Sequence, residues 1–390
     1  MFQINRRQML SATGAAVGCA MVGLRRKALG APPATIQERK VISHKPHLFH
    51  GWPTVARRSN GDLLVVCSGG REAHVCPFGR VELMRSRDGG DSWSWPQVMM
   101  DSPIDDRDAG VLETAKGSIL ITTFTSLAYE SQLRRAEPIE PGQPGAWPPE
   151  RLARWQAAHK RATADERQAA LSVWMIRSTD GGVTFSGRYF CGVNSPHGPV
   201  QLSDGRLLYA GKELWHGDRR IGVCESTDDG QSWQWLATIP TREGDSHQNY
   251  HELHAVEAAD GRLIVQIRNH NQANTRETLQ AESDDGGKTW SVPHPIGVWG
   301  LPSHLLRLRD DRLLMTYGYR RAPIGNLARV SDDHGRTWSE PIVLSDDGTG
   351  DIGYPSTVQL DDGSLVSVWY EAMQGSPNAV LRQARWSLGR

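Results

Sequence analysis

Three histidines in one short segment are the first residues of this chain whose spacing suggests chemistry. The segment HQNYHELH carries His247, His251 and His254, and imidazole nitrogens are common zinc ligands. On a helix this spacing would gather the three rings on one face. The surrounding sequence is instead typical of a loop leading into a strand, where alternate residues face opposite ways. We therefore expect no metal site here, and we expect the protein to act without a cofactor.

Five copies of one short phrase recur along the chain. Each has Ser, then Asp two places on, Gly two further, then Ser or Thr and a terminal aromatic residue. The copies begin at Ser86, Ser178, Ser226, Ser283 and Ser331. The Asp side chain can accept from nearby backbone N–H groups, Gly permits a positive φ, and the aromatic ring covers the turn. We expect each phrase to form a structural turn and none of them to be the functional site.

A second repeated phrase predicts the number of structural units. Six turn-plus-strand phrases, among them NGDLLVV and DGRLIVQ, are interleaved with the five turns. The equivalent positions in the six copies are Gly61, Gly117, Gly205, Gly261, Asp311 and Gly363. Successive positions lie 50 to 56 residues apart, except for one interval of 88 residues. A unit of roughly fifty residues suits one four-stranded blade. The pattern predicts an all-β, six-bladed β-propeller whose last phrase, VLRQARWSL, closes the ring against an N-terminal strand.

Together the two repeats resemble the sialidase superfamily, whose neuraminidase-like propellers carry this turn as the Asp-box or BNR repeat. The resemblance covers nearly the whole chain after its first thirty residues. It implies one sialidase-like six-bladed propeller over residues 31–390, with glycans as partners. Propellers host many functions, so the repeat is more specific for fold than for reaction.

The enlarged second repeat contains the only strongly helical sequence in the chain. We place this insertion at residues 129–171 and expect two short helices above the ring. Pro149 suits a first helical position, and Thr163 with Glu166 forms a capping box. The insertion could shape a substrate pocket as a lid, or it could be a solvated charged hairpin.

The first thirty residues are typical of an export signal. NRRQMLSATGAAVGCAMVGL joins paired arginines to a mildly apolar stretch, and small residues from Ala28 to Ala31 suit cleavage. This pattern resembles a twin-arginine signal over residues 1–30, which implies a periplasmic or secreted protein. The apolar stretch is too short and too rich in Gly and Ala for a convincing span, so we expect no stable membrane span in the mature chain. A retained anchor is the alternative.

Charge and cysteine content exclude some classes of protein. Lys plus Arg and Asp plus Glu both number 44, but the first thirty residues hold five cations and no acid, so the remainder carries a net charge of −5. Such a chain is a poor partner for nucleic acid. We expect the four cysteines of the mature chain to be buried thiols, with a Cys67–Cys76 bridge as the alternative.

Two segments resemble the stretches that carry the catalytic pair of sialidases. YHELHAVEAADGRLIVQIRNH resembles the segment in which a Glu begins one strand and an Arg ends the next, here Glu252 and Arg268. DIGYPSTVQL resembles the stretch that carries the nucleophilic tyrosine, here Tyr354. The resemblance implies that Glu252 deprotonates Tyr354, which attacks the anomeric carbon. A neutral nucleophile avoids repulsion where that carbon also bears a carboxylate.

The arginines that would bind the substrate fit the family pattern only in part. Sialidases usually present an Arg-Ile-Pro phrase on the first strand, but this chain has Gly51-Trp52-Pro53. Arg268 matches the second arginine of the family's carboxylate clamp, and Arg321, or its neighbour Arg320, approximately matches the third. Arg71 in GGREAH and Arg107 in DDRDAG could supply the missing positive charge.

Histidines occupy three further positions of interest. His74 falls where sialidases place a general-acid Asp, and an imidazole can act as an acid near neutral pH. The alternative is a loop histidine held by hydrogen bonds. His197 and His304 recur ahead of their turns, where each could line the pore mouth and bind sugar hydroxyls, although repeat geometry alone would also place polar residues there.

These observations predict an exported exo-glycoside hydrolase that releases a terminal anionic sugar through a retaining Tyr/Glu mechanism. Two other functions stay open. A polysaccharide lyase acting on uronate-containing glycans would use His and Tyr as base and acid, with Arg neutralising the uronate. A non-catalytic carbohydrate-binding propeller would account for the missing first arginine and the replaced acid.

Overall fold

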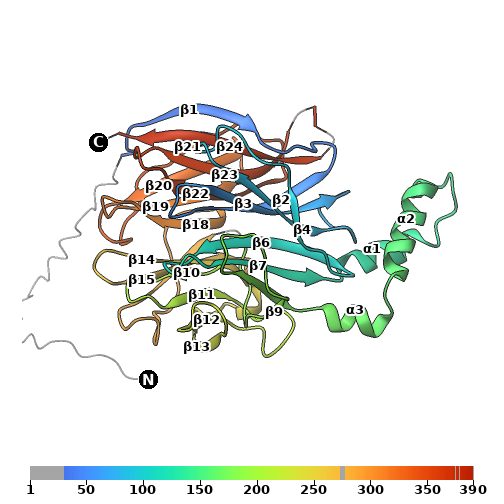
Figure 1. Cartoon of the computed structure of the whole chain (residues 1–390), viewed down its shortest axis with the longest axis horizontal. Coiled ribbons are helices and arrows are strands. Elements are labelled where there is room, and N and C mark those ends of the chain that lie inside the picture. Colours follow the sequence, from blue (N-terminus) through green and yellow to red (C-terminus); the bar gives the residue numbers. More distant parts are fainter. Residues whose placement is uncertain (1–29, 273–276, 374, 377, 390) are drawn as a thin grey trace, which may run out of the picture.

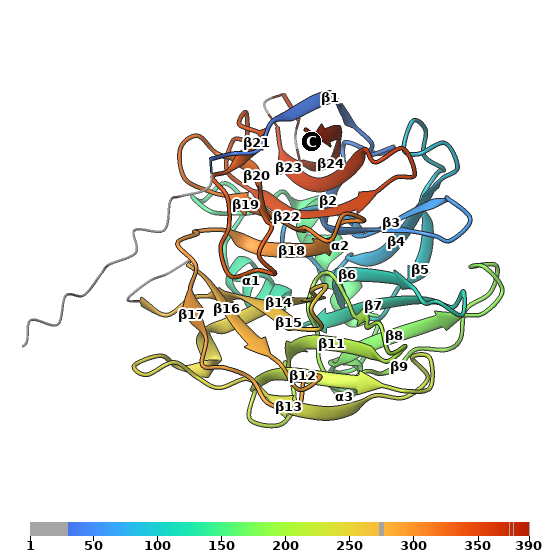
Figure 2. The same cartoon turned by 90° about the vertical axis from the view of Figure 1, so that its left-hand side faces the viewer.

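The chain folds into a six-bladed β-propeller. The computed structural model describes residues 30–272, 277–373, 375, 376 and 378–389. Within them, six four-stranded antiparallel sheets form a ring, which Figure 1 shows from the side. Figure 2 views the ring with the first strands of the sheets near its centre. The predicted fold class is therefore confirmed.

Each of the first five blades is a meander whose strands follow the chain from the centre outward. The first two blades consist of β2 (Phe49–Arg57), β3 (Leu63–Arg71), β4 (Arg80–Ser86) and β5 (Gln97–Met100), and of β6 (Asp105–Glu113), β7 (Ile119–Ser126), β8 (Val173–Ser178) and β9 (Tyr189–Phe190). The next two consist of β10 (Val200–Gln201), β11 (Leu207–Lys212), β12 (Ile221–Ser226) and β13 (Gln234–Thr238), and of β14 (Tyr250–Glu257), β15 (Leu263–Asn269), β16 (Thr278–Ser283) and β17 (His294–Pro295). The fifth consists of β18 (Leu301–Arg307), β19 (Leu313–Tyr319), β20 (Gly325–Ser331) and β21 (Ile342–Ser345).

The sixth blade closes the ring with strands from both ends of the chain. It contains β22 (Ile352–Gln359), β23 (Leu365–Ala372), β24 (Ala379–Leu388) and β1 (Ala34–Val41). β1 pairs antiparallel with β24, from Ala34 opposite Leu388 to Val41 opposite Arg382. The predicted closure against an N-terminal strand is confirmed.

The apolar core is divided among the junctions between blades. Six clusters of buried side chains each join two neighbouring blades, including the junction of the first and sixth, where Val65 and Val368 belong to one cluster. Strands buried on both faces in this way are rich in Val, Ile and Leu. No blade buries its faces alone, so the ring must be complete to be stable.

The turn-plus-strand phrases form the same turn in all six blades. A backbone N–H donates to a carbonyl oxygen three residues earlier, at distances of 2.8 to 3.1 Å, in every copy. Five copies place Gly in the left-handed region at the donor position, and the remaining copy places Asp311 there with φ of 69°. Asp is one of the few residues that tolerate this conformation, so the substitution preserves the turn.

The five Asp-boxes form the expected hairpin turns. In the box that begins at Ser283, Asp285 Oδ1 accepts from Ser283 Oγ at 2.8 Å and from Thr289 N at 2.9 Å, and Asp285 Oδ2 accepts from Thr289 Oγ1 at 2.7 Å. The other four boxes repeat these contacts. The carboxylate thus organises the turn, which supports a structural role.

We expect acid to destabilise the propeller through these turns. Hydrogen bonds from Thr289 and Ser283 lower the pKa of Asp285 to about 2, and the pKa of the box residue Asp180 is lowered as well. A carboxyl group whose folded pKa is depressed stabilises the fold above its unfolded pKa, and this contribution is lost as pH falls through the folded value. The unfolding temperature should therefore drop between about pH 4 and pH 2. In Asp285→Asn that drop should be smaller, and an unchanged pH profile would contradict the assignment.

The insertion forms three helices, one more than predicted. They are α1 (Ala128–Ala136), α2 (Pro149–Lys160) and α3 (Ala164–Ala170). Pro149 begins α2, and Thr163 and Glu166 form the capping box of α3, as predicted. α1 has no side-chain cap, so its start carries none of the signals used to find the other two helices.

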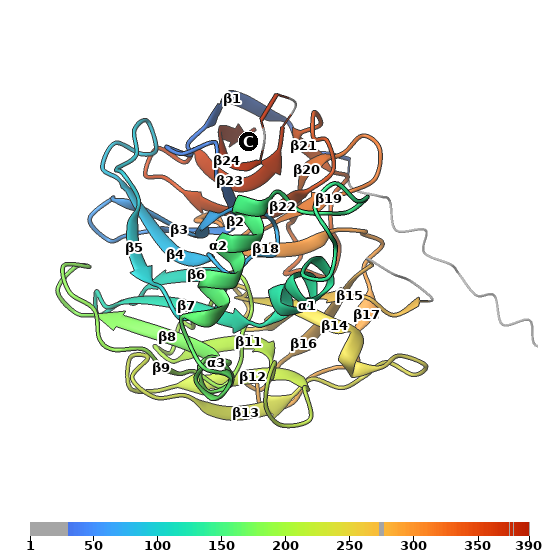
Figure 3. The same cartoon turned by 90° about the vertical axis from the view of Figure 1, so that its right-hand side faces the viewer.

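The helices lie over one face of the ring (Figure 3) and are firmly attached to it. Trp155 is fully buried in a separate apolar cluster that also contains Cys76, Ile104 and Tyr129. Trp155 Nε1 donates to Glu72 Oε2 at 3.0 Å, and Glu72 belongs to the loop that carries His74. The insertion therefore packs against this loop, which makes a merely solvated hairpin a poor description.

The described cysteines Cys67, Cys76, Cys191 and Cys224 are buried free thiols, so the alternative Cys67–Cys76 bridge is absent. The predicted export signal lies outside the described residues except for Gly30. Among the helices that the structure describes, none has the length and apolar character needed to cross a membrane.

Candidate functional site

Glu252, Arg268 and Tyr354 form one contact network at the centre of the ring. Tyr354 Oη donates to Glu252 Oε1 at 2.5 Å, and Arg268 Nη1 lies 2.5 Å from Glu252 Oε2. Arg268 Nη1 also donates to Tyr354 Oη at 3.1 Å. The structure thus brings together a phenol, a carboxylate and a guanidinium from three strands, β22, β14 and β15.

Local irregularities of the innermost strands position these side chains. The pairing register shifts around Trp52 in β2, Glu252 in β14 and Tyr354 in β22. All three residues have positive φ, of 54°, 43° and 56° respectively, which is costly for side chains of this size. Bulges and strained backbone occur frequently at active sites, where they aim side chains that a regular strand would direct elsewhere.

The network lies on the face opposite the Asp-boxes. Glu252 and Tyr354 are near the starts of the innermost strands. The box residue Ser86 instead pairs with Leu63, which follows the end of the innermost strand β2. The helices depart from the same face as the network, since Ser126 at the end of β7 pairs with Asp105 at the start of β6.

Electrostatics keeps Glu252 ionised and Tyr354 protonated in the free protein. Burial alone would raise the pKa of Glu252, but the charge of Arg268 and its hydrogen bond lower it overall. Burial, together with the charge of Glu252, raises the pKa of Tyr354 well above its ordinary value. Tyr354 is therefore not a resting phenolate, and Glu252 accepts the hydrogen bond of its hydroxyl group.

A second network extends from the first toward the rim. Arg320 Nη2 donates to Tyr370 Oη at 2.8 Å, and Tyr370 Oη donates to Asp351 Oδ1 at 2.7 Å. Asp351 Oδ2 lies 2.8 Å from Nδ1 of His74, whose side chain is 45% exposed. The ring of Tyr370 contacts that of Tyr354, with centroids 5.7 Å apart, so the two networks are continuous.

Of the two arginines considered for the clamp, Arg320 is the one in the site. It extends across the start of β22, where Nε donates to the carbonyl of Ile352 at 2.8 Å. Arg321 is exposed and stacks over the ring of Trp299, with 4.8 Å between the guanidinium and the ring centroid. The two side chains leave the end of β19 in different directions, which explains why sequence spacing alone did not separate them.

Arg71 is not available to a substrate. Its side chain is fully buried and forms two bonds with Asp105, Nη1 to Oδ1 at 2.6 Å and Nη2 to Oδ2 at 2.9 Å. The remaining N–H groups donate to Ser68 Oγ and to the carbonyl oxygens of Ala73, His74 and Asp106. With every donor used, Arg71 holds the first two blades together and shapes the His74 loop.

Arg107 and Trp52 occupy the part of the site where the family pattern has an arginine. The guanidinium of Arg107 lies over the indole of Trp52, 4.3 Å from the ring centroid. It also donates to the carbonyl of His74 at 3.1 Å, and its contact with Asp105 is long, at 3.4 Å. The edge of Trp52 meets the ring of His74, with centroids 4.9 Å apart. Arg107 is thus only weakly paired with a carboxylate, like Arg320, whose Nη2 lies 3.5 Å from Asp351 Oδ1.

Asp108 is a site residue that the sequence interpretation missed. It lies in β6 where the register shifts between Arg107 and Gly110, and it is 5% exposed. Burial is the largest cause that raises its pKa to about 7, the charge of Arg107 opposes the rise, and the charge of Glu252 adds to it. The sequence DDRD shows a run of acids but not which carboxyl group faces the centre.

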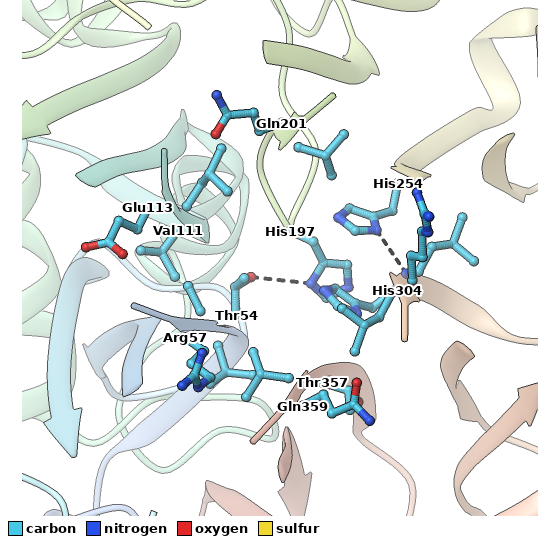
Figure 4. Close-up of a pocket in the computed structure, with 18 of the residues that line it drawn as sticks. Thr54, Arg57, Val111, Glu113, His197, Gln201, His254, His304, Thr357 and Gln359 are labelled. Carbon is cyan, nitrogen blue, oxygen red and sulfur yellow. Dashed lines mark hydrogen bonds between the residues drawn. The ribbon is translucent and has the colours of Figure 1, made fainter. Parts of the chain in front are cut away.

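His197 and His304 lie in the channel behind this site. They form a cluster with His254, whose ring stacks on that of His304 with centroids 4.5 Å apart. The cluster lines a cavity of about 360 Å³, together with Arg57, Glu113 and Arg307 at the far ends of innermost strands. Figure 4 shows the three histidines close together in this cavity. The cavity therefore opens toward the Asp-box face, away from Glu252.

The channel histidines are neutral. Burial lowers the pKa of His304 to about 3 and lowers those of His197 and His254 well below the ordinary value. His254 Nδ1 accepts from the backbone N–H of Leu305 at 2.9 Å, so its proton is on Nε2. Among the described residues, no group of three or more His, Cys, Asp or Glu side chains is placed to hold a metal ion.

Sequence comparisons identify a repeat family that covers much of the chain. Residues 152–367 match the family described as BNR repeat-like domain. A sialidase from Micromonospora viridifaciens is 24% identical over 263 residues, which are 56% of this chain and 37% of the relative. The chain therefore corresponds to little more than a third of that protein.

Solved structures show the same architecture. A protein of unknown function from Dyadobacter fermentans superimposes with a TM-score of 0.73 at 22% identity, covering 92% of this chain and 100% of the other. The Hadza microbial sialidase Hz136 superimposes with a TM-score of 0.61 at 18% identity, covering 86% of this chain and 65% of the other. At these identities the likeness is one of fold.

Proposed function

The chain belongs to the BNR repeat-like domain family, and on that premise we propose that it is an exported exo-glycoside hydrolase that releases a terminal anionic sugar with retention of configuration. The observation that carries the proposal is the 2.5 Å hydrogen bond from Tyr354 Oη to Glu252 Oε1, beside Arg268. A phenol aligned with a carboxylate base is the arrangement that a tyrosine nucleophile requires. The paired arginines in residues 1–30 support export.

Reaction at this site proceeds in two displacements. Tyr354 Oη attacks the anomeric carbon while its proton passes to Glu252, and the glycosidic bond breaks as the leaving oxygen takes a proton from an acid. Water then attacks the same carbon from the side that the leaving group vacated. Tyr354 regains its proton from Glu252, and the two inversions give net retention.

An anionic sugar suits the electrostatics of the network. In the free protein, Arg268 stabilises the charged form of Glu252 and so makes it a weak base. A substrate carboxylate bound to Arg268 would share that positive charge, and the proton affinity of Glu252 would rise. Glu252 would then become a stronger base only when substrate is present. Arg320 and Arg107 would add positive charge at the rim.

The leaving group needs a proton donor, and two side chains qualify by position. His74 is exposed at the rim and hydrogen-bonded to Asp351. Asp108 is buried, and it interacts electrostatically with Glu252 and Tyr354.

The proposal is tested by trapping the covalent intermediate. The purified protein is first incubated with sialosides and with uronate-terminated oligosaccharides, and the anomeric form of the product is followed by NMR. A fluorinated glycosyl fluoride of the accepted sugar is then added, because the fluorine slows release of the intermediate. Mass spectrometry should find the glycosyl group on the peptide that contains Tyr354.

Other outcomes of this experiment identify the other functions. A product that absorbs in the ultraviolet as an unsaturated uronate indicates a lyase. Affinity for a glycan without any product indicates a carbohydrate-binding propeller. Either result overturns the hydrolase proposal.

A further inference from the structure

The innermost strands present equivalent positions toward the centre of the ring. The register shifts that contain Trp52, Asp108, Glu252 and Tyr354 all lie near the starts of their strands, in the first, second, fourth and sixth blades. A register shift therefore also occurs at Asp108, although its φ is not positive as it is at Glu252 and Tyr354. This equivalence places a second carboxyl group in the layer that holds the catalytic pair.

The surroundings of Asp108 differ from those of the acids beside it. Asp105 is paired with Arg71, and Asp106 Oδ2 accepts from the backbone N–H of Ser102 at 2.6 Å. Asp108 is almost completely buried, and among the described residues no other residue donates a hydrogen bond to its carboxyl group, which is bonded to its own backbone N–H. Buried carboxyl groups are normally paired with or hydrogen-bonded to other residues, so one that is bonded only to its own backbone requires an explanation.

Asp108 is also within electrostatic range of the reacting groups. Several charged or titratable side chains interact electrostatically with Asp108. They come from its own strand and from neighbouring strands, and they are Arg71, Arg107, Tyr209, Glu252 and Tyr354. Burial beside the negative charge of Glu252 favours the neutral acid, and its pKa of about 7 leaves a proton available near neutral pH. A neutral Asp108 also does not compete with a substrate anion for the positive charge of Arg107, which keeps its contacts with Asp105 and the His74 carbonyl.

We propose that Asp108 is the proton donor to the leaving group and, in the second step, the base that activates water. This inference rests on the proposed hydrolase function. In the first step the Asp108 O–H proton passes to the glycosidic oxygen as its bond to the anomeric carbon breaks and the bond to Tyr354 Oη forms. In the second step the Asp108 carboxylate takes a proton from water, whose oxygen displaces Tyr354. Asp108 and Glu252 both return to their starting states, and the net reaction consumes one water.

His74 then has a different task. Its Nδ1 is engaged by Asp351, and its ring packs edge-on against Trp52 and Phe49. These contacts hold the imidazole at the rim as a binding group.

The test compares Asp108→Asn with His74→Gln on two substrates of the accepted sugar, one with a poor alcohol leaving group and one with nitrophenol. Asp108→Asn should lower kcat/KM for the first substrate by about 100 to 10,000-fold and for the second by less than about tenfold, because nitrophenolate leaves without protonation. The activity of the parent should fall as pH rises through about 7, and this limb should vanish in Asp108→Asn. His74→Gln should lower both rates by a similar factor.

A matched control separates chemistry from folding. Asp101→Asn makes the same change at an exposed position near the start of the same blade and should leave both rates unchanged. Thermal unfolding verifies that Asp108→Asn is folded, and trapping on Tyr354 verifies that it still forms the intermediate. If the leaving-group dependence appears in His74→Gln instead, or in neither variant, Asp108 is not the donor while the hydrolase function stands. If the parent cleaves no glycoside, both proposals fall.

Discussion

Tyr354→Phe is expected to lower kcat by at least about a thousandfold while glycan affinity changes little. Loss of a covalent nucleophile removes the pathway itself, and effects of three or more orders of magnitude are usual. The phenylalanine ring keeps the contacts with Trp52 and Tyr370, whose centroids lie 6.4 and 5.7 Å from that of Tyr354. The site should therefore keep its shape. Initial rates and calorimetric titration with the same glycan provide the two measurements.

Tyr189→Phe is the matched control for this prediction. Tyr189 lies in β9 at the outside of the second blade, and its hydroxyl donates to the carbonyl of Gly230 at 2.5 Å. Loss of that bond changes stability slightly and should leave kcat unchanged. A Tyr354→Phe protein with more than about a tenth of the parental kcat would exclude the nucleophile role.

Asp105→Ala is expected to destabilise the fold by about 3 to 5 kcal/mol. Both partners of the Arg71–Asp105 pair have fully buried side chains, so the variant leaves an uncompensated guanidinium in the interior. Arg71 also supports the backbone of the His74 loop, which should lose order together with the pair. Urea unfolding followed by tryptophan fluorescence measures the change in free energy of unfolding.

Two further variants show whether the effect comes from the unpaired charge. The double variant Arg71→Met/Asp105→Leu should regain much of the loss, because an apolar pair can replace a buried ion pair. Asp310→Ala breaks the more exposed pair with Arg312 and should cost less than about 1 kcal/mol. If Asp105→Ala and Asp310→Ala lower the free energy of unfolding equally, burial does not determine how much the Arg71–Asp105 pair contributes to stability.

The fold was predictable because its signals are local and repeated. The turn at Gly61 and the Asp-box at Ser283 each need only a few consecutive residues, and their spacing gives the size of a blade. α1 was missed because Ala128 to Ala136 lacks a capping side chain and follows directly from a strand. Helices without such start signals gain their stability from packing, here through Tyr129 and Leu133.

The site was less predictable because it depends on backbone irregularities. Strand alternation cannot show that Asp108 lies at a register shift, since a single extra residue changes which face a side chain occupies. Arg320 and Arg321 are neighbours, and only the path of the chain after β19 separates them. Arg71 shows the reverse problem. An arginine side chain can bind a substrate anion, but the guanidinium of Arg71 is already paired with the carboxylate of Asp105, 34 residues later in the sequence.

The pairing of β1 with β24 also bears on how the protein is synthesised. β1 leaves the ribosome early but finds its partner only after nearly the whole chain has been translated. The first five blades contain consecutive strands and can assemble on the nascent chain in order. The sixth blade, which carries Tyr354, is completed last, so an interrupted translation product would expose the edge of an open ring and lack Tyr354.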